Sequence, residues 1–371
     1  MYSLAEEIRK RKSDHIRICL KHDVGARGVS TWLEHVWLVH SAIPAADYDA
    51  IDMRVRFLGH DFSAPIMVSA MTGGTEEAGS INAAIAEAVE ELGLGMGVGS
   101  QRAALKNPDV AKTFRIARER APSAFIVANI GYSEIARGLP LRALEELVAM
   151  IEADALAIHL NPLQEVVQAE GKPGGRGFLD KLAEITSALP VPVIVKEVGS
   201  GISAGVAKAL EMRGVRAVDV AGAGGTSWAA VEHYRALEEG DALRARLGRT
   251  FWDWGIPTAA SILEVAFSTR MAIIASGGVR TGLDVAKCLA LGAHMAAMAL
   301  PVLKEAVKGT DAVKALLSCV MEELRAALFV TGCKRVNDLK AAPIVLTGPL
   351  AEWARARGLA IEGLARRLGG P

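Results

Sequence analysis

The sequence has few cysteines, and they stand far apart. Its 371 residues contain only Cys19, Cys288, Cys319 and Cys333, and no two of them form a C-x-x-C motif. A disulfide framework or a zinc knuckle requires more cysteines, or cysteines at closer spacing. We therefore expect reduced thiols and a cytoplasmic protein.

The chain also lacks an excess of charge and a long apolar run. Its 42 basic and 42 acidic residues cancel, so neither a nucleic acid nor an anionic membrane is expected as a partner. The N-terminal stretch "MYSLAEEIRKRKSDHI" has no apolar core typical of a signal peptide. No apolar run reaches the roughly 18 residues that a membrane span needs. Any affinity for phosphate must therefore come from local clusters of basic side chains.

The chain does contain short apolar runs that alternate with amphipathic segments. Strands are expected at 66–70, 93–98, 125–130, 155–160, 193–197, 217–221, 272–276 and 295–299. Helices are expected at 80–92, 108–120, 140–153, 178–189, 202–213, 257–270 and 282–291. Nearly continuous apolar strands are typical of a parallel sheet that is covered on both faces. Eight such units favour an α/β protein of the (β/α)8 TIM-barrel class over a doubly wound sheet, which usually needs fewer strands.

The flanks of this barrel have their own patterns. We expect residues 1–64 to form an N-terminal extension that contributes to the substrate site, with a helix near 3–12 and short strands near 37–39 and 52–57. Residues 65–305 would form the barrel, and 306–371 a helical extension packed on it, broken at 341–349. The connection 222–257 is unusually long, which predicts either a lid or binding element or a contact between subunits.

Polar residues follow almost every predicted strand, at the end of the barrel where chemistry is normally found. Turns alone explain the glycines, but they do not explain why Arg102, Gln164, Glu165 and Lys196 converge on one rim. The turn "SGGVRTG" at 276–282 precedes a predicted helix and resembles a cradle for phosphate. Lys196 either reaches the rim as a structural lysine or places a cation beneath a flavin.

Eight motifs carry a resemblance to a known family. They are "RKSDHI" (11–16), "MTGG" (71–74), "GSQR" (99–102), "HLNPLQE" (159–165), "KEVG" (196–199), "GAGGTSW" (222–228), "DWGIPT" (253–258) and "SGGVRTGLDVAKCLALGA" (276–293). From about residue 9 to 339 the chain resembles the FMN-dependent type 2 isopentenyl-diphosphate δ-isomerases. Some of these motifs occur in other FMN barrels, but "RKxDHI" together with "HLNxxQE" is specific to this family.

The resemblance implies an activity and its requirements. The reaction is an allylic 1,3-proton shift that converts isopentenyl diphosphate to dimethylallyl diphosphate in isoprenoid biosynthesis. FMN in its reduced form would act as acid/base and stabilise the cation. Mg²⁺ would bind the diphosphate, and NAD(P)H would serve as reductant. A homotetramer or homo-octamer is expected.

The resemblance also implies roles for individual residues. FMN would contact Ala70, Met71, Thr72, Gly73, Ser100, Asn129, Lys196, Thr226, Ser276, Gly277, Gly278, Arg280, Ala297, Met298 and Ala299. Substrate would contact Arg11, Lys12, His15, Ser100, Gln101, Arg102, His159, Gln164 and Trp228. Gln164, His159 and Asn161 would be catalytic, and Glu165 would be the metal ligand.

Simpler interpretations remain open for several of these residues. The run 9–12 could be a solvated basic helix face, Glu165 a surface carboxylate and His159 a buried structural histidine. An amide is a poor base, so Gln164 is interpreted as a positioning group or proton relay, with the flavin or the diphosphate as the terminal base. Ala221 stands where many relatives have a serine that contacts FMN, which removes one hydrogen bond, worth about 1 kcal/mol.

Two other classes of protein compete with this interpretation. An α-hydroxyacid oxidase would need a histidine base with arginines, and an IMP-dehydrogenase-like enzyme would need a loop cysteine, whereas Cys288 falls inside a helical pattern. A non-catalytic flavin-binding barrel would not need Arg11, Lys12, Arg102 and Glu165 together.

Overall fold

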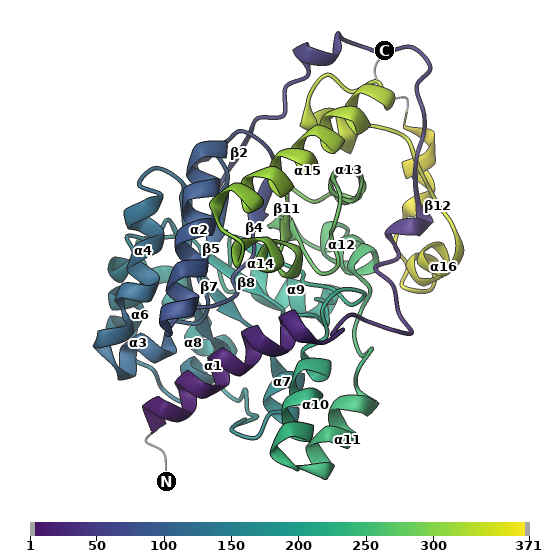
Figure 1. Cartoon of the computed structure of the whole chain (residues 1–371). Coiled ribbons are helices and arrows are strands. Elements are labelled where there is room, and N and C mark those ends of the chain that lie inside the picture. The colour runs from purple at the N-terminus through teal and green to yellow at the C-terminus, as the bar shows by residue number, and fades with distance from the viewer. Residues whose placement is uncertain (1–3, 368–371) are drawn as a thin grey trace.

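Eight parallel strands form a closed barrel in the computed structural model, which describes residues 4–367 (Figure 1). In chain order they are β4 (Ile66–Val68), β5 (Gly95–Gly97), β6 (Phe125–Gly131), β7 (Ala155–His159), β8 (Val193–Lys196), β9 (Ala217–Asp219), β10 (Ala272–Ala275) and β11 (Met295–Met298). All eight predicted strands are confirmed. Seven of them end one or two residues earlier than predicted, because the residues that follow leave the ladder to form the turns of the rim.

Helices surround the barrel. The ring is made by α2 (Glu76–Leu92), α4 (Lys112–Arg120), α6 (Leu141–Met150), α8 (Phe178–Ala188), α9 (Ala204–Glu211), α12 (Thr258–Ala266), α13 (Gly282–Ala290) and α15 (Thr310–Val330). Short helices α3 (Arg102–Lys106), α5 (Tyr132–Ala136), α7 (Pro162–Val167) and α14 (Leu300–Ala306) lie in the connections. Because α15 packs on both α13 and α2, it closes the ring (Figure 1). The boundary predicted at residue 305 therefore separates the barrel from one of its own helices.

One end of the barrel is plugged by aromatic side chains. The hairpin of β2 (Val55–Phe57) and β3 (His60–Phe62) brings Phe57 and Phe62 against Phe125 at the start of β6. Their ring centroids lie 5.5 to 6.4 Å apart, within the usual range for aromatic pairs. This plug fills the amino-terminal end and leaves the carboxyl-terminal end for a ligand.

Segments from the N-terminal and C-terminal extensions pair in a small sheet. Strand β1 (Val36–Leu38) pairs antiparallel with β12 (Ile344–Leu346), and α16 (Gly348–Ala356) follows. The short 3-10 helices are η1 (Leu33–His35), η2 (Tyr48–Ala50), η3 (Pro108–Val110), η4 (Val336–Lys340) and η5 (Ile361–Arg366). Strand β12 was not predicted, because it lies in the interval 341–349 that was interpreted only as a break between helices.

The long connection 222–257, for which a lid, a binding element or a subunit contact was predicted, contains a helical hairpin. Helix α10 (Trp228–Glu239) ends at Gly240, and α11 (Ala242–Thr250) begins after Asp241, whose side chain accepts a hydrogen bond from the Arg244 N–H. The helices approach closely at Gly248, where an added Cβ would lie 2.6 Å from the Ala229 carbonyl oxygen. In the described residues, no helix combines the length and apolarity of a membrane-crossing segment.

Candidate active site

A cavity of about 230 Å³ opens at the carboxyl-terminal end of the barrel. Most of the residues predicted for the site line it: Arg11, Lys12, His15, Ala70, Met71, Thr72, Ser100, Arg102, Asn129, His159, Asn161, Gln164, Glu165, Lys196, Thr226, Trp228, Ser276, Gly277, Gly278, Arg280, Ala297 and Ala299. They come from eight strand ends and from α1 (Leu4–Lys21), which lies across this end (Figure 1). The fold thus brings together side chains that are up to 288 positions apart in the sequence.

Three predicted contact residues lie behind this lining. Gln101 is fully buried, and its side chain accepts from the Asn129 N–H at 3.0 Å and donates to the Leu147 carbonyl at 3.0 Å. Met298 is packed in the hydrophobic core. Gly73 packs against Phe114, since an added Cβ would lie 2.1 Å from its ring, and its carbonyl accepts from Lys12 Nζ. None of the three residues lines the cavity, and their contacts with FMN or substrate remain predictions.

Helix α1 brings positive charge to the cavity. It was predicted for residues 3–12 but continues to Lys21, so Arg11, Lys12 and His15 all belong to it. Lys12 Nζ donates to the carbonyls of Gly73 and Ser100, the latter at 2.9 Å. Arg9 and Lys10 are exposed, whereas Arg11 and Lys12 face inwards. The interpretation of a solvated basic face therefore applies only to the first two residues of the run.

Lys12 has an unusual electrostatic environment. Its burial, and then the charges of Arg11 and Arg102, lower its pKa to about 7. Arg102 itself pairs with Glu134 at 2.8 Å. Three cations held this close to one another favour an anion between them.

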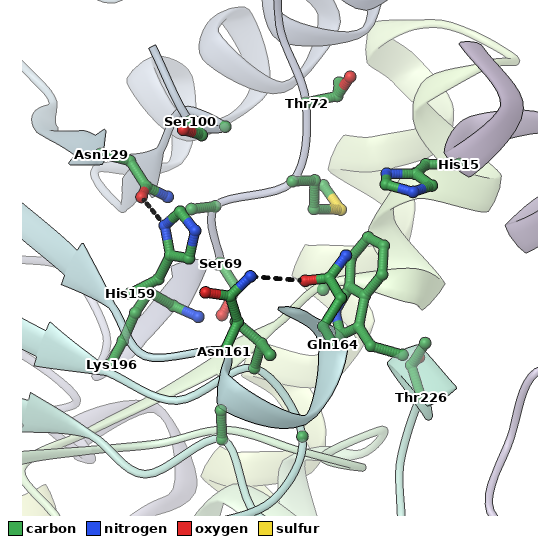
Figure 2. A pocket seen from close by; sticks show the side chains of 18 of the residues that line it. His15, Ser69, Thr72, Ser100, Asn129, His159, Asn161, Gln164, Lys196 and Thr226 are labelled. Carbon is green, nitrogen blue, oxygen red and sulfur yellow. Dashed lines mark hydrogen bonds between the residues drawn. The ribbon is translucent and has the colours of Figure 1, made fainter. Parts of the chain in front are cut away.

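The histidine of "HLNPLQE" is neutral at ordinary pH. It is the last residue of β7, and its Nδ1 lies 2.7 Å from Oδ1 of Asn129, an atom that can only accept (Figure 2). Burial, and then the nearby charge of Lys196, lower the pKa of His159 to about 3. His159 therefore donates through Nδ1 and leaves Nε2 as an acceptor.

The amide of Gln164 is held on both sides. Asn161 Nδ2 donates to its Oε1 at 3.0 Å, and its Nε2 donates to Glu232 Oε1 at 3.1 Å (Figure 2 shows the first bond). Glu232 also receives hydrogen bonds from His15 at 2.9 Å and from Arg235 at 3.2 Å. Burial alone would raise the pKa of Glu232, but His15 and Arg235 lower it to about 2. Glu232 is thus a permanent carboxylate behind Gln164.

Glu165 is a buried carboxylate beside the same cavity, which excludes the simpler interpretation of a surface group. Its Oε2 accepts from the Lys172 N–H at 2.8 Å, and Oε1 lies 3.4 Å from Asn161 Nδ2. Within residues 4–367, no group of three or more His, Cys, Asp or Glu side chains is arranged to hold a metal. A cation here would need oxygen ligands from a phosphate and from water, which suits Mg²⁺.

In the part of the chain that the structure describes, glycine turns and unpaired polar atoms in the cavity wall suit a flavin phosphate and ring. Gly277 (φ +94°) and Gly278 (φ +78°) form the turn before α13, and an added Cβ on Gly277 would lie 2.2 Å from the Gly222 carbonyl oxygen. Ser69 Oγ and Asn161 Oδ1 are buried polar atoms with no hydrogen-bond partner among the described residues. Unsatisfied polar atoms in a cavity wall are destabilising unless a ligand or a water forms a hydrogen bond with them. Ala221 lines the cavity and offers no side-chain donor.

Several lining or supporting residues were not predicted. Glu232 and Arg235 were missed because no helix was predicted in the connection 222–257, although Trp228, Glu232 and Arg235 share one helical face. Ser69 and Glu134 line the cavity next to predicted motifs. The apolar lining of Ile16, Cys19, Leu300 and Leu303 was also missed. A helix extended to Lys21 would have indicated Ile16 and Cys19.

Comparisons with known proteins agree with this geometry. A family model described as FMN-dependent dehydrogenase matches residues 161–346. An isopentenyl-diphosphate delta-isomerase of Methanosarcina barkeri is 48% identical, over 96% of this chain and 97% of the relative. One of Metallosphaera sedula is also 48% identical, over 95% and 96%.

Among solved structures, a mandelate oxidase covers 93% of this chain and 99% of its own, with a TM-score of 0.61 at 16% identity. At that identity the likeness supports the barrel fold alone. The identity of nearly one half to the curated relatives, over almost the whole of both chains, decides the family. The chain belongs to the isopentenyl-diphosphate delta-isomerase family.

Proposed function

We propose that the chain converts isopentenyl diphosphate to dimethylallyl diphosphate with FMN and Mg²⁺. The observation that carries this proposal is one cavity in which the α1 cations, the Glu165 carboxylate and the doubly held Gln164 amide lie together. The names of the relatives point to the same reaction.

The polar end of the substrate would lie between α1 and the loop after β5. Arg11, Lys12 and Arg102 supply the positive charge, and arginine adds a planar pair of donors suited to phosphate oxygens. Glu165 would hold Mg²⁺ against the diphosphate as the single protein ligand. A site with one carboxylate binds Mg²⁺ weakly until the diphosphate adds its oxygens.

The loops after β4, β10 and β11, together with the carboxyl ends of β6 and β8, would hold FMN. Gly277, Gly278 and Arg280 suit its phosphate, and Lys196, Asn129 and Thr72 suit the ring edge. When it is bound in reduced form, FMN supplies a proton donor beside its ring face and an electron-rich surface for a nearby cation. Lys196 would stabilise negative charge on the ring.

The protein groups near the alkene would orient protons and exclude bulk water. The neutral His159 is a hydrogen-bonding group and is too weak a base to hold a proton near neutral pH. Gln164, fixed by Asn161 and Glu232, would relay or position a proton. Trp228, whose ring meets the His15 ring edge-on at 5.0 Å, would cover the hydrocarbon end and help to keep the site dry.

An anaerobic isomerase assay tests the proposal. The purified protein is expected to bind FMN and to form dimethylallyl diphosphate only when the flavin is reduced and Mg²⁺ is present. Equal activity with oxidised flavin would refute the acid–base role of the reduced cofactor. Oxidation of a 2-hydroxy acid without isomerisation would instead favour an oxidase.

Three finer statements belong to the same proposal. We infer that NAD(P)H reduces the bound flavin, that the protein acts in the cytoplasm and that it forms a homotetramer or homo-octamer. Anaerobic bleaching of the flavin absorbance by NADH and by NADPH tests the first. Cell fractionation tests the second, and light scattering of the FMN-loaded protein tests the third.

A further inference from the structure

A second, smaller cavity lies inside the barrel, against the floor of the main one. It encloses about 30 Å³. Ser69, Ala70, Lys196 and Ala297 line both cavities. The rest of its wall is contributed by Asp219 and by small or apolar residues of the strands: Met67, Val68, Gly97, Val127, Ala157, Ile194 and Ile274.

Three polar groups in this wall have unmet hydrogen-bonding capacity. Ser69 Oγ is buried and has no partner among the described residues. Asp219 Oδ1 accepts from the Ser276 hydroxyl and from the Ala221 N–H, but within residues 4–367 no donor reaches its Oδ2. That oxygen lies 4.0 Å from Lys196 Nζ, which is too far for a direct hydrogen bond.

These three groups satisfy the physical conditions for a bound water. A polar contact longer than a hydrogen bond is typical of groups that share a bridging water. A water needs about 10–15 Å³ of such space and two to four polar partners. The cavity exceeds the first requirement, and Ser69, Lys196 and Asp219 meet the second.

We propose that this cavity is a water-binding site in which a water bridges Ser69 Oγ, Lys196 Nζ and Asp219 Oδ2. The water accepts from Lys196 and donates to Asp219, and its remaining hydrogen-bonding capacity serves Ser69. It thereby links the end of β4 to β8 and β9, which are neighbours through the register of Lys196 with Asp219.

The site also determines how Lys196 is presented to the main cavity. A lysine has three N–H donors, and one of them goes to the Glu197 carbonyl at 2.6 Å. The water takes the second. The third is then left for the main cavity, which Lys196 also lines. The Glu197 carbonyl and the water thus hold the Lys196 ammonium group in place on the side of the small cavity.

A high-resolution crystal structure of the flavin-free protein tests the proposal directly. One density peak is expected within hydrogen-bonding distance of all three groups. In a crystal of Ser69→Ala, which retains Lys196 and Asp219, the peak is expected to be lost or to fall in occupancy. A dry cavity, or a direct bond from Lys196 or Ser69 to Asp219 Oδ2, would overturn the proposal.

A double-mutant cycle provides an independent test in solution. Unfolding equilibrium constants are measured on flavin-free protein for Ser69→Ala, Asp219→Asn and the double variant. Because one water connects the two residues, the double variant is expected to differ by at least about threefold from the product of the single effects. Single effects that simply multiply would contradict a shared water.

Ser261→Ala provides the matched control for this cycle. Ser261 is a buried serine that bonds both the N–H and the carbonyl of Ile202, and it does not line the small cavity. Its effect and that of Ser69→Ala should multiply within about twofold. All of these measurements use flavin-free protein, so failure of the isomerase proposal would leave them unaffected.

Discussion

At the scale of single residues, burial beside Arg11 and Arg102 makes the charge of Lys12 depend on pH near neutrality. Its pKa is lowered from 10.5 to about 7 in the folded protein. Between these two values the unfolded chain binds more protons, so Lys12 makes the free energy of unfolding rise with pH. A bound anion has the opposite preference and favours the protonated lysine.

We therefore predict that isopentenyl diphosphate binds less tightly as the pH rises above about 7. In Lys12→Arg this decline between pH 7 and 9 should largely disappear, because arginine keeps its charge. Binding to the FMN-loaded protein is measured by calorimetry at several pH values. Comparison of the two proteins cancels the titration of the diphosphate itself. An identical decline in both would show that Lys12 is not the group responsible.

For Gln164, the contacts predict a separation of turnover from binding. Gln164→Ala removes an amide that Asn161 and Glu232 hold in place, so kcat should fall at least about tenfold while substrate affinity changes little. Steady-state kinetics together with direct binding measurements check this. A loss confined to KM would refute its role in positioning or relaying a proton.

For Glu165, we predict an effect on the Mg²⁺ requirement. Glu165→Gln removes the only carboxylate assigned to Mg²⁺, so the Mg²⁺ concentration for half-maximal activity should rise about tenfold or more. Glu134→Gln is the control, because Glu134 also lines the cavity but is paired with Arg102. Equal Mg²⁺ titrations for Glu165→Gln and the parent protein would remove Glu165 as the ligand.

At the scale of elements, the α10–α11 hairpin supports the site by carrying Trp228, Glu232 and Arg235 on one helix. Arg235 extends this support through its ion pair with Glu170 in the loop after α7. The hairpin depends on close approach at Gly248, where an added Cβ would meet the Ala229 carbonyl and the His233 side chain.

Gly248→Ala should therefore lower the free energy of unfolding by about 1–3 kcal/mol, the usual cost of overpacking. Gly205→Ala is the control, because Gly205 lies in α9 and an added Cβ there meets nothing within 4 Å. Denaturant unfolding of both variants measures the difference. Equal stabilities would show that the hairpin can relax to accept the methyl group.

At the scale of the whole molecule, α15 completes the ring of helices around the barrel, although the last barrel strand, β11, ends before α15 begins. It covers apolar faces of α2 and α13 and buries Val313, Leu317, Val320 and Leu324. Gly282 permits this packing, since an added Cβ would lie 2.3 Å from the Val320 carbonyl oxygen.

A chain that ends at residue 305 is thus predicted to lose cooperative unfolding, although it contains all eight strands. Differential scanning calorimetry of the truncated and full chains checks this. A sharp transition at the temperature of the full chain would show that the barrel is complete without α15.

The amino-acid sequence by itself determined the barrel and the composition of its rim. Short apolar runs of similar length, separated by amphipathic segments, predicted all eight strands correctly. Both the apolar runs and the helical periodicity are local features of the sequence. The polar ends of the strands indicated the cavity because parallel strands present their carboxyl ends on one side. Residues such as His159, Asn161 and Lys196 could be placed there from their positions alone.

Tertiary structure alone decided which side chains face the cavity and which groups support them. Gln101 follows the same strand as Ser100 but turns into the wall, because its amide finds backbone partners there. Glu232 meets Gln164 from 68 positions away, and β12 forms only because β1 offers an edge. These contacts depend on packing between distant segments, which no local pattern of the sequence records.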